Sequence, residues 1–483
     1  MIKKIADKYR RIPLGVKVAF WYMVCNFFQK GISTLTTPIF TRLMNTTEYG
    51  EFTLFTSWQS ILLVIVSLKL SGGVYQQGLV KFEDDKDRFT SSLLGLSTTL
   101  VLAFFVLYLL FRHSFNGLFD MSTAVMVGMF ASILATCTFS LWSYRCRMDY
   151  DYIPLVIITL LVGIAKPLVG IIAVINSTEK GTARIFSVVA VEVVVYLFLY
   201  IAIFRKNHVF FDKKFWSYSL AFNIPLIPHF LSQSILIQSD RIMIKEICGS
   251  SFVGIYGLAY SISMMMNLVN NAVNDTLVPW IYKSIKDKRY VELRNVSSNI
   301  ILLIAVADLL VIGLAPELIH IFAPPEYSDA IWIIPPVSMS IFFTFLYCFY
   351  ADFEYYYEKT KFIMAASVFS AGLNIALNYV FIHLYGYIAA GYTTLVCYIV
   401  YCLLHYYNYN RIKKKEIGRD EIYDSRRILV ISVFFIAIGF VLMLLYKTLI
   451  ARYALVVSIG VYLILKRKDI LAIFRMRRDK VIK

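Results

Sequence analysis

Charged residues are scarce in this sequence of 483 residues, in which Asp, Glu, Lys and Arg together make up 16%. Soluble domains carry about 25% charged residues, and a soluble chain of this length would divide into several such domains. Here 59% of the residues are hydrophobic, mean hydropathy is +0.67, and the apolar residues form long uninterrupted runs. Most of these runs reach about 18–27 residues, which is enough for a helix to cross a hydrocarbon core of about 30 Å. The composition therefore excludes an ordinary soluble protein and indicates an integral membrane protein.

The sequence also lacks the motifs of several enzyme classes. None of its seven cysteines forms a CxxC pair, so the sequence contains neither a disulfide framework nor a zinc site. It has no GxxxxGK[ST] motif, and ATP hydrolysis is therefore excluded. No metal cluster or nucleophile constellation is found either. We predict that the protein is not an enzyme and holds no cofactor.

Basic residues alternate between the loops, and this pattern predicts about 14 transmembrane helices. About 36 of the 48 lysines and arginines fall on one side of the membrane and about 8 on the other, which places both termini in the cytoplasm. The net charge of +17 thus reflects membrane topology and contact with lipid head groups, and no nucleic acid is expected as a partner. The predicted spans are 16–42, 52–70, 90–111, 122–144, 152–175, 184–204, 216–239, 253–280, 295–315, 330–351, 362–383, 386–406, 428–446 and 450–465.

An internal repeat predicts two lobes. Segment 27–58 resembles segment 230–262 at an offset of 204 residues, with Gly50 aligned with Gly254. Both segments read as a polar-faced helix, a short outer turn and a second helix. The first and seventh helices run in the same direction, so the repeats are parallel and a substrate site is expected near the membrane midplane. We predict a lobe of helices one to six over 1–206, a lobe of helices seven to twelve over 207–407, and an addition over 408–483 that holds two more helices.

Four charged residues fall near mid-depth of the predicted spans, where a charge costs at least about 2.5–3.5 kcal/mol and must face protein or water. They are Lys30, Lys166, Glu192 and Asp308. Lys166 and Glu192 lie on adjacent helices, and they have two interpretations: residues lining the substrate site, or an internal ion pair. Arg145, after the fourth helix, also has two interpretations: a residue that meets an anionic head group, or an ordinary cytoplasmic charge.

The surroundings of Lys30 favour a cavity wall. Asn26, Lys30, Ser33, Thr37 and Thr41 recur at spacings of three and four and share one helical face. A lysine that pairs with a carboxylate for helix packing is the alternative.

Helix eight carries the strongest polar pattern, and we expect it to face a ligand. Asn267, Asn270, Asn271, Asn274 and Asp275 are predicted to lie on one face. Because amides both donate and accept hydrogen bonds, such a face suits a ligand rich in hydroxyl groups.

Two further helices show related features. Helix eleven repeats the polar theme more weakly with Asn374 and Asn378, and we include Asn374 in the predicted substrate-binding set. Helix seven contains Pro225 and Pro228, which predict a bend.

Two segments resemble a known family. KGISTLTTPIFTRLMNTTEYGEFTLF (30–55) is similar to the first-helix signature of the Wzx-type polysaccharide flippases, which move O-antigen and capsule repeat units. IPLIPHFLSQSILIQSDRIMIKEICGSSFVGIYGLAYSISMMMNLVNNAVNDTLVPWIY (224–282) is similar to their seventh and eighth helices, with the PLIP, SDR and GIY elements in order. These flippases belong to the multidrug/oligosaccharidyl-lipid/polysaccharide exporter superfamily, whose members share the plan of two lobes.

The resemblance implies that the chain moves an undecaprenyl-pyrophosphate-linked oligosaccharide from the inner to the outer leaflet of a bacterial cytoplasmic membrane, for lipopolysaccharide or capsule synthesis. It also implies alternating access driven by a proton or sodium gradient, with other glycan-assembly proteins as partners. Family members often present arginines in the cavity, whereas the mid-depth cations here are lysines, which lack the bidentate geometry of arginine.

Three alternatives remain open from the sequence. The first is a drug or metabolite antiporter of the same superfamily, which would need carboxylates in the first lobe. The second is a membrane glycan polymerase, which is disfavoured because no outer loop exceeds about 15 residues and such enzymes place catalytic acids in large outer loops. The third is a scaffold protein of a glycan-assembly complex that transports nothing.

Overall fold

The computed structural model describes residues 14–418 and 420–465, apart from a few side chains in the first and last helices. Within this part the chain is all-helical, as predicted, and contains no strand. Twelve helices or continuous helical segments are long and apolar enough to cross a membrane. The first helix and the last lie at the two other predicted spans but do not belong to the twelve, so the total of fourteen stays a prediction.

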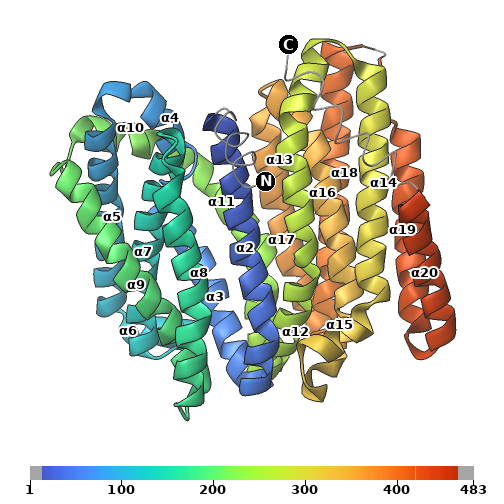
Figure 1. Cartoon of the computed structure of the whole chain (residues 1–483), viewed down its shortest axis with the longest axis horizontal. Coiled ribbons are helices and arrows are strands. Elements are labelled where there is room, and N and C mark those ends of the chain that lie inside the picture. Colours follow the sequence, from blue (N-terminus) through green and yellow to red (C-terminus); the bar gives the residue numbers. More distant parts are fainter. Residues whose placement is uncertain (1–13, 419, 466–483) are drawn as a thin grey trace, which may run out of the picture. The chain divides into compact units, whose positions relative to one another are not determined.

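The chain divides into two compact units, Met1–Ile242 and Met243–Lys483. Figure 1 labels the helices of each unit. The first unit contains α2 (Leu14–Leu43), α3 (Thr46–Ser67), α4 (Val74–Lys81), α5 (Lys86–Leu110), α6 (Arg112–Phe119), α7 (Thr123–Met148), α8 (Tyr152–Ile175), α9 (Lys180–Lys206) and α10 (Lys213–Asn223). Helix α11 (Ile227–Cys248) contains the point of division.

The second unit contains the remaining helices. They are α12 (Ser250–Ser263), α13 (Met265–Lys286), α14 (Tyr290–Gly313), α15 (Ala315–Phe322), α16 (Ile334–Tyr356), α17 (Thr360–Tyr385), α18 (Ala389–Glu416), α19 (Ser425–Leu444) and α20 (Leu449–Leu465).

Local sequence signals explain several helix boundaries. Asn45 caps α3 with a capping box, since its side chain accepts a hydrogen bond from the Glu48 amide at 2.9 Å and the Glu48 carboxylate accepts one from the Asn45 amide at 2.8 Å. Ser122 and Asp212 cap α7 and α10 in the same general way. The predicted bend of helix seven corresponds to a 3₁₀ turn, Ile224–Leu226, between α10 and α11.

The helix breaks agree with the predicted repeat. Helix α3 begins at Thr46 and α12 begins at Ser250, which are 204 residues apart, the offset found in the sequence. In both places a long helix ends two or three residues earlier, at Leu43 and at Cys248.

The first unit extends further along the chain than the predicted lobe, which ended at residue 206. The reason is that α10 is fastened to the preceding helices. The Trp216 indole donates a hydrogen bond to the Ser92 carbonyl at 2.9 Å, and the Asn223 amide donates one to the Leu68 carbonyl at 2.8 Å. Arg88 and Asp212 form an ion pair at 2.9 Å.

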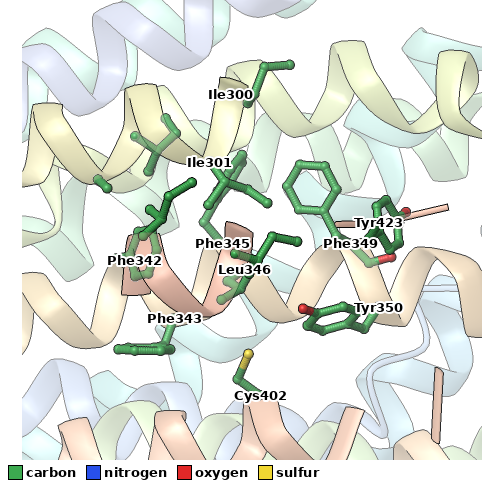
Figure 2. Close-up of a cluster of buried hydrophobic side chains, with 14 of the residues drawn as sticks. Ile300, Ile301, Phe342, Phe343, Phe345, Leu346, Phe349, Tyr350, Cys402 and Tyr423 are labelled. Carbon is green, nitrogen blue, oxygen red and sulfur yellow. Dashed lines mark hydrogen bonds between the residues drawn. The ribbon is translucent and has the colours of Figure 1, made fainter. Parts of the chain in front are cut away.

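The last two helices belong to the compact second unit. They pack on α14, and the Tyr446 hydroxyl donates a hydrogen bond to the Ile312 carbonyl at 2.7 Å. The segment before α19 is fixed by Tyr423, whose ring lies against Phe349 and Tyr350 in the large apolar core of the unit (Figure 2). Its hydroxyl donates to the Phe349 carbonyl at 3.1 Å.

A close backbone approach in the first unit gives a testable prediction. A Cβ atom at Gly95 of α5 would lie 2.0 Å from the carbonyl oxygen of Phe210, which is backbone and cannot rotate away. We expect Gly95→Ala to destabilise the protein by about 1–3 kcal/mol and to lower its Tm by about 2–10 °C in detergent. Gly372→Ala on α17 is the control, because a Cβ there meets nothing within 4 Å. Equal Tm values for the two variants would contradict the packing described.

Candidate functional site

A buried polar network crosses the first unit and joins four of its helices. Lys166 of α8 and Glu192 of α9 form an ion pair, with Nζ 2.6 Å from Oε1. The other carboxylate oxygen of Glu192 accepts a short hydrogen bond from the Ser132 hydroxyl of α7. Gln59 of α3 donates to that hydroxyl at 2.5 Å. The internal ion pair predicted as one alternative for Lys166 and Glu192 is therefore present.

The exposure of the two charged side chains differs. The Glu192 side chain is 9% exposed, whereas that of Lys166 is 26% exposed. A carboxylate that accepts from both a lysine and a serine is electrostatically satisfied. The ammonium group still has donor capacity for a further acceptor, since a lysine carries three N–H donors.

Arg184 is a cation that the sequence reasoning did not select. It lies near the beginning of α9 and is buried. Its Nη1 donates a hydrogen bond to the Lys166 carbonyl at 3.0 Å. The guanidinium also lies over the ring of Phe40, 3.8 Å from the centroid. No carboxylate within the described residues forms an ion pair with it. Gly170 leaves room for the guanidinium, because a Cβ there would lie 2.0 Å from Nη1.

Helix α2 holds the predicted polar stripe. The side chains of Asn26 and Lys30 lie outside the described residues, so their role stays a prediction. The hydroxyl of Thr37 donates to the Ser33 carbonyl at 3.0 Å, and that of Thr41 donates to the Thr37 carbonyl at 3.2 Å. Hydrogen bonds of this kind satisfy threonine within its own helix. The threonines of the stripe therefore do not by themselves require a ligand.

The polar residues predicted to share one face of helix eight lie on α13, where one of them is buried and the others are at least partly exposed. Asn270 is buried, and its amide donates to the Ile341 carbonyl of α16 at 3.4 Å. Asn271 and Asp275 are exposed, and Asn274 is half-buried. Asn267 is also half-buried and donates to the Met264 sulfur at 3.2 Å. A ligand could therefore reach Asn271, Asn274 and Asp275, whereas Asn270 supports packing inside the unit.

The half-buried Asn274 carries a prediction. Asn274→Leu should reduce export of surface glycan by about 2- to 12-fold, because one hydrogen bond to a ligand contributes about 0.5–1.5 kcal/mol. Asn270→Leu serves as the comparison and should leave export close to the wild-type level. The measurement is glycan on the cell surface at matched amounts of membrane-inserted protein. A larger loss of surface glycan for Asn270→Leu than for Asn274→Leu would contradict the assignment of Asn274 to ligand contact and of Asn270 to packing.

Asn374 and Asn378 bind each other and the neighbouring helix. Both are buried, and the Asn378 amide donates to the Asn374 side-chain oxygen at 3.2 Å. Thr393 of α18 donates a short hydrogen bond to the Asn378 side-chain oxygen. This polar contact joins α17 to α18, and it accounts for the weaker polar pattern seen in helix eleven.

Arg145 does not present a free positive charge. At the end of α7 it forms ion pairs with Asp149 at 2.6 Å and with Asp87 at 3.1 Å. The same residues line a cavity of about 130 Å³, which Lys206 and Asp151 also border. The cavity therefore carries both signs of charge, and a head group entering it would have to displace a carboxylate from Arg145.

A model of the family described as polysaccharide biosynthesis protein matches residues 16–285, which is more than half of the chain. The chain belongs to that family. A second model, MatE, matches residues 225–380.

Similar proteins agree with this placement. An Lsg locus protein of Haemophilus influenzae is 22% identical over 377 residues, which cover 74% of this chain and 88% of the relative. The fold is similar to that of the lipid II flippase MurJ in an inward closed conformation, with a TM-score of 0.70, 15% identity and coverage of 92% of this chain and 99% of that one. It is also similar to an inward-facing MATE multidrug resistance transporter, with a TM-score of 0.64, 15% identity and coverage of 80% and 96%.

The family and the fold together confirm the resemblance seen in the sequence. The chain is a multi-pass membrane protein of the polysaccharide biosynthesis family, with a fold that is shared by the lipid II flippase MurJ and by a MATE transporter.

Proposed function

We propose that the protein is a flippase that moves an undecaprenyl-pyrophosphate-linked oligosaccharide from the inner to the outer leaflet of a bacterial cytoplasmic membrane. The observation that carries this proposal is the match of the polysaccharide biosynthesis family over residues 16–285. The fold shared with a lipid II flippase supports it. The product would serve O-antigen or capsule synthesis, together with other glycan-assembly proteins, and both termini would lie in the cytoplasm.

The chemistry of the described residues is compatible with such a substrate. Lys166 and Arg184 supply cations inside the first unit that are suited to a pyrophosphate group. The accessible amides of α13 suit sugar hydroxyls, which need both donors and acceptors. Alternating access of the two lobes, driven by a proton or sodium gradient, is the mechanism that we propose for the transport step.

A second candidate is a cation-coupled drug antiporter, which the MatE match over residues 225–380 favours. An antiporter of this kind needs a carboxylate in the first lobe that can exchange its cation. Among the described residues of the first unit, Glu192 and Asp240 are the buried carboxylates, and Glu192 is neutralised by Lys166 at 2.6 Å. This pairing favours the flippase over the antiporter.

The proposal is tested by deleting the gene and locating the lipid-linked oligosaccharide that accumulates. A flippase defect should leave the oligosaccharide in the inner leaflet, where a glycosidase added from outside cannot reach it. An unpolymerised unit exposed in the outer leaflet would indicate a polymerase instead. Unchanged amounts of surface glycan together with raised drug sensitivity would indicate the antiporter.

A further inference from the structure

The second unit contains a pair of titratable side chains that the transport site described above does not use. Glu354 lies in the last turn of α16, and His405 lies on α18. His405 Nδ1 is 3.0 Å from Glu354 Oε2, and both side chains are 0% exposed. The remaining polar atoms of the pair, Glu354 Oε1 and His405 Nε2, have no hydrogen-bond partner in the part of the chain that the structure describes.

Aromatic side chains enclose this pair. The Tyr347 ring stacks on the imidazole at 5.4 Å between centroids, the Tyr401 ring meets it edge-on at 4.6 Å, and Phe362 of α17 lies at 6.4 Å. The Tyr401 hydroxyl is engaged with the Ser367 hydroxyl at 2.9 Å.

Few other titratable groups face the pair. Asp352 and Tyr355 lie next to Glu354 on the same helix, and Tyr355 interacts electrostatically with both carboxylates. Tyr347 of α16 and Tyr401 of α18 also lie against the pair, and α17 contributes the apolar ring of Phe362. Cys348 of α16 interacts electrostatically with Tyr347 and Tyr355. Within the described residues, no lysine or arginine forms an ion pair with Glu354 or Asp352.

The number of protons on the pair determines whether it can be buried. With Nε2 protonated and one further proton on Nδ1 or on Oε2, the pair has no net charge and can stay in a dry aromatic surrounding. When that proton leaves, neutral imidazole and carboxylate remain, and a net negative charge without a cation partner is costly to bury. The deprotonated pair therefore needs water, which the enclosed arrangement excludes.

We infer that Glu354 and His405 form a proton-binding site of the transport cycle, loaded in the enclosed state and emptied when the inner ends of α16 and α18 admit water. Glutamate and histidine inside membrane-spanning helices are the side chains that relay protons in pumps and transporters. The proton passes between Oε2 or Nδ1 and water, and no other bond is made or broken. This inference rests on the proposed function, since it names the ion that drives the transport.

A purely structural role makes a different prediction. A pair that only joins α16 to α18 could be replaced by two apolar residues of similar volume, often with neutral or favourable stability, and with transport retained. A proton site cannot be replaced in that way. The double variant Glu354→Leu/His405→Leu therefore separates the two roles, provided that its amount and Tm match those of the wild type.

The first arm of the test needs no substrate. Infrared difference spectra of the purified full chain in liposomes, recorded across a pH step, should contain a contribution of the Glu354 carboxyl group besides those of the buried Asp308 and Asp352. This contribution should be lost in Glu354→Gln and kept in His383→Gln, the control, whose histidine is exposed on α17. Difference spectra of Glu354→Gln that equal those of the wild type would overturn the proton site whatever the protein transports.

The second arm measures coupling in the same liposomes with a fluorescent undecaprenyl-pyrophosphate oligosaccharide as the probe. An imposed pH gradient should accelerate flipping by the wild type. In Glu354→Gln this acceleration should be at least about tenfold smaller, while slow flipping without a gradient remains. Acceleration retained in Glu354→Gln, or in the stable double leucine variant, would refute the coupling. Absence of flipping by the wild type, with the infrared contribution of Glu354 intact, would count against the proposed function and leave the proton site standing.

Discussion

Lys166→Ala is expected to abolish export of surface glycan and to lower the stability of the protein. Without the ammonium group, Glu192 keeps a buried carboxylate whose remaining partner is the Ser132 hydroxyl. Removal of one member of a buried ion pair costs about 3–5 kcal/mol, because it leaves a charge without compensation. The measurements are the Tm in detergent and the surface glycan in a deletion strain that carries the variant.

A double variant separates the structural contribution of this pair from its contribution to transport. Lys166→Met/Glu192→Met removes both charges at similar volume and should regain most of the lost stability. We expect the double variant to remain defective in export, because the ammonium group that we assign to the pyrophosphate is still missing. Wild-type export by a stable double variant would show that the pair serves packing alone.

Lys30→Ala is the second variant with a large expected effect. It should abolish glycan export while the protein remains inserted in the membrane at normal amounts. Placing a lysine near mid-depth of a span costs free energy unless the side chain faces protein or water, so its presence there indicates that it does not face lipid. Lys30→Arg should retain part of the activity, since it keeps the positive charge at the same depth.

The control for this prediction lies on the same helix. Lys17 is near the beginning of α2, and Lys17→Ala should leave export unchanged. Surface glycan is measured for all three variants against the amount of protein in the membrane fraction. Wild-type glycan in the Lys30→Ala strain would remove this residue from the substrate site.

Much of the fold could be predicted because bilayer thickness dictates the length of each apolar run. The order of the spans, the turn before Thr46 and the matching turn before Ser250 follow from hydropathy and the internal repeat. The short helices α4, α6 and α15 could not be predicted in this way, because each has only 8 residues and none fills a transmembrane window. The attachment of α10 to the first unit depends on contacts of Trp216 and Asn223 with distant carbonyls, which no local pattern records.

Contacts in the candidate site could be predicted where two charged residues lie on adjacent helices, and less well elsewhere. Lys166 and Glu192 were adjacent in helix order and equal in depth, so their pairing could be anticipated. Helical periodicity gives the angle between Asn270 and Asn271, but it does not say which of them points into the lobe. The neutralisation of Arg145 by Asp87 joins residues on different helices, and the burial of Arg184 against Phe40 does the same. Such pairings depend on tertiary packing.

Transport is measured most directly as flipping by the purified protein in liposomes that contain a labelled undecaprenyl-pyrophosphate oligosaccharide. A glycosidase that cannot cross the membrane reports the fraction of label in the outer leaflet over time. We expect liposomes with the wild-type protein to expose nearly all of the label within minutes, whereas those with Lys30→Ala or Lys166→Ala expose it no faster than protein-free liposomes. Equal rates for wild-type and protein-free liposomes would contradict the proposed function.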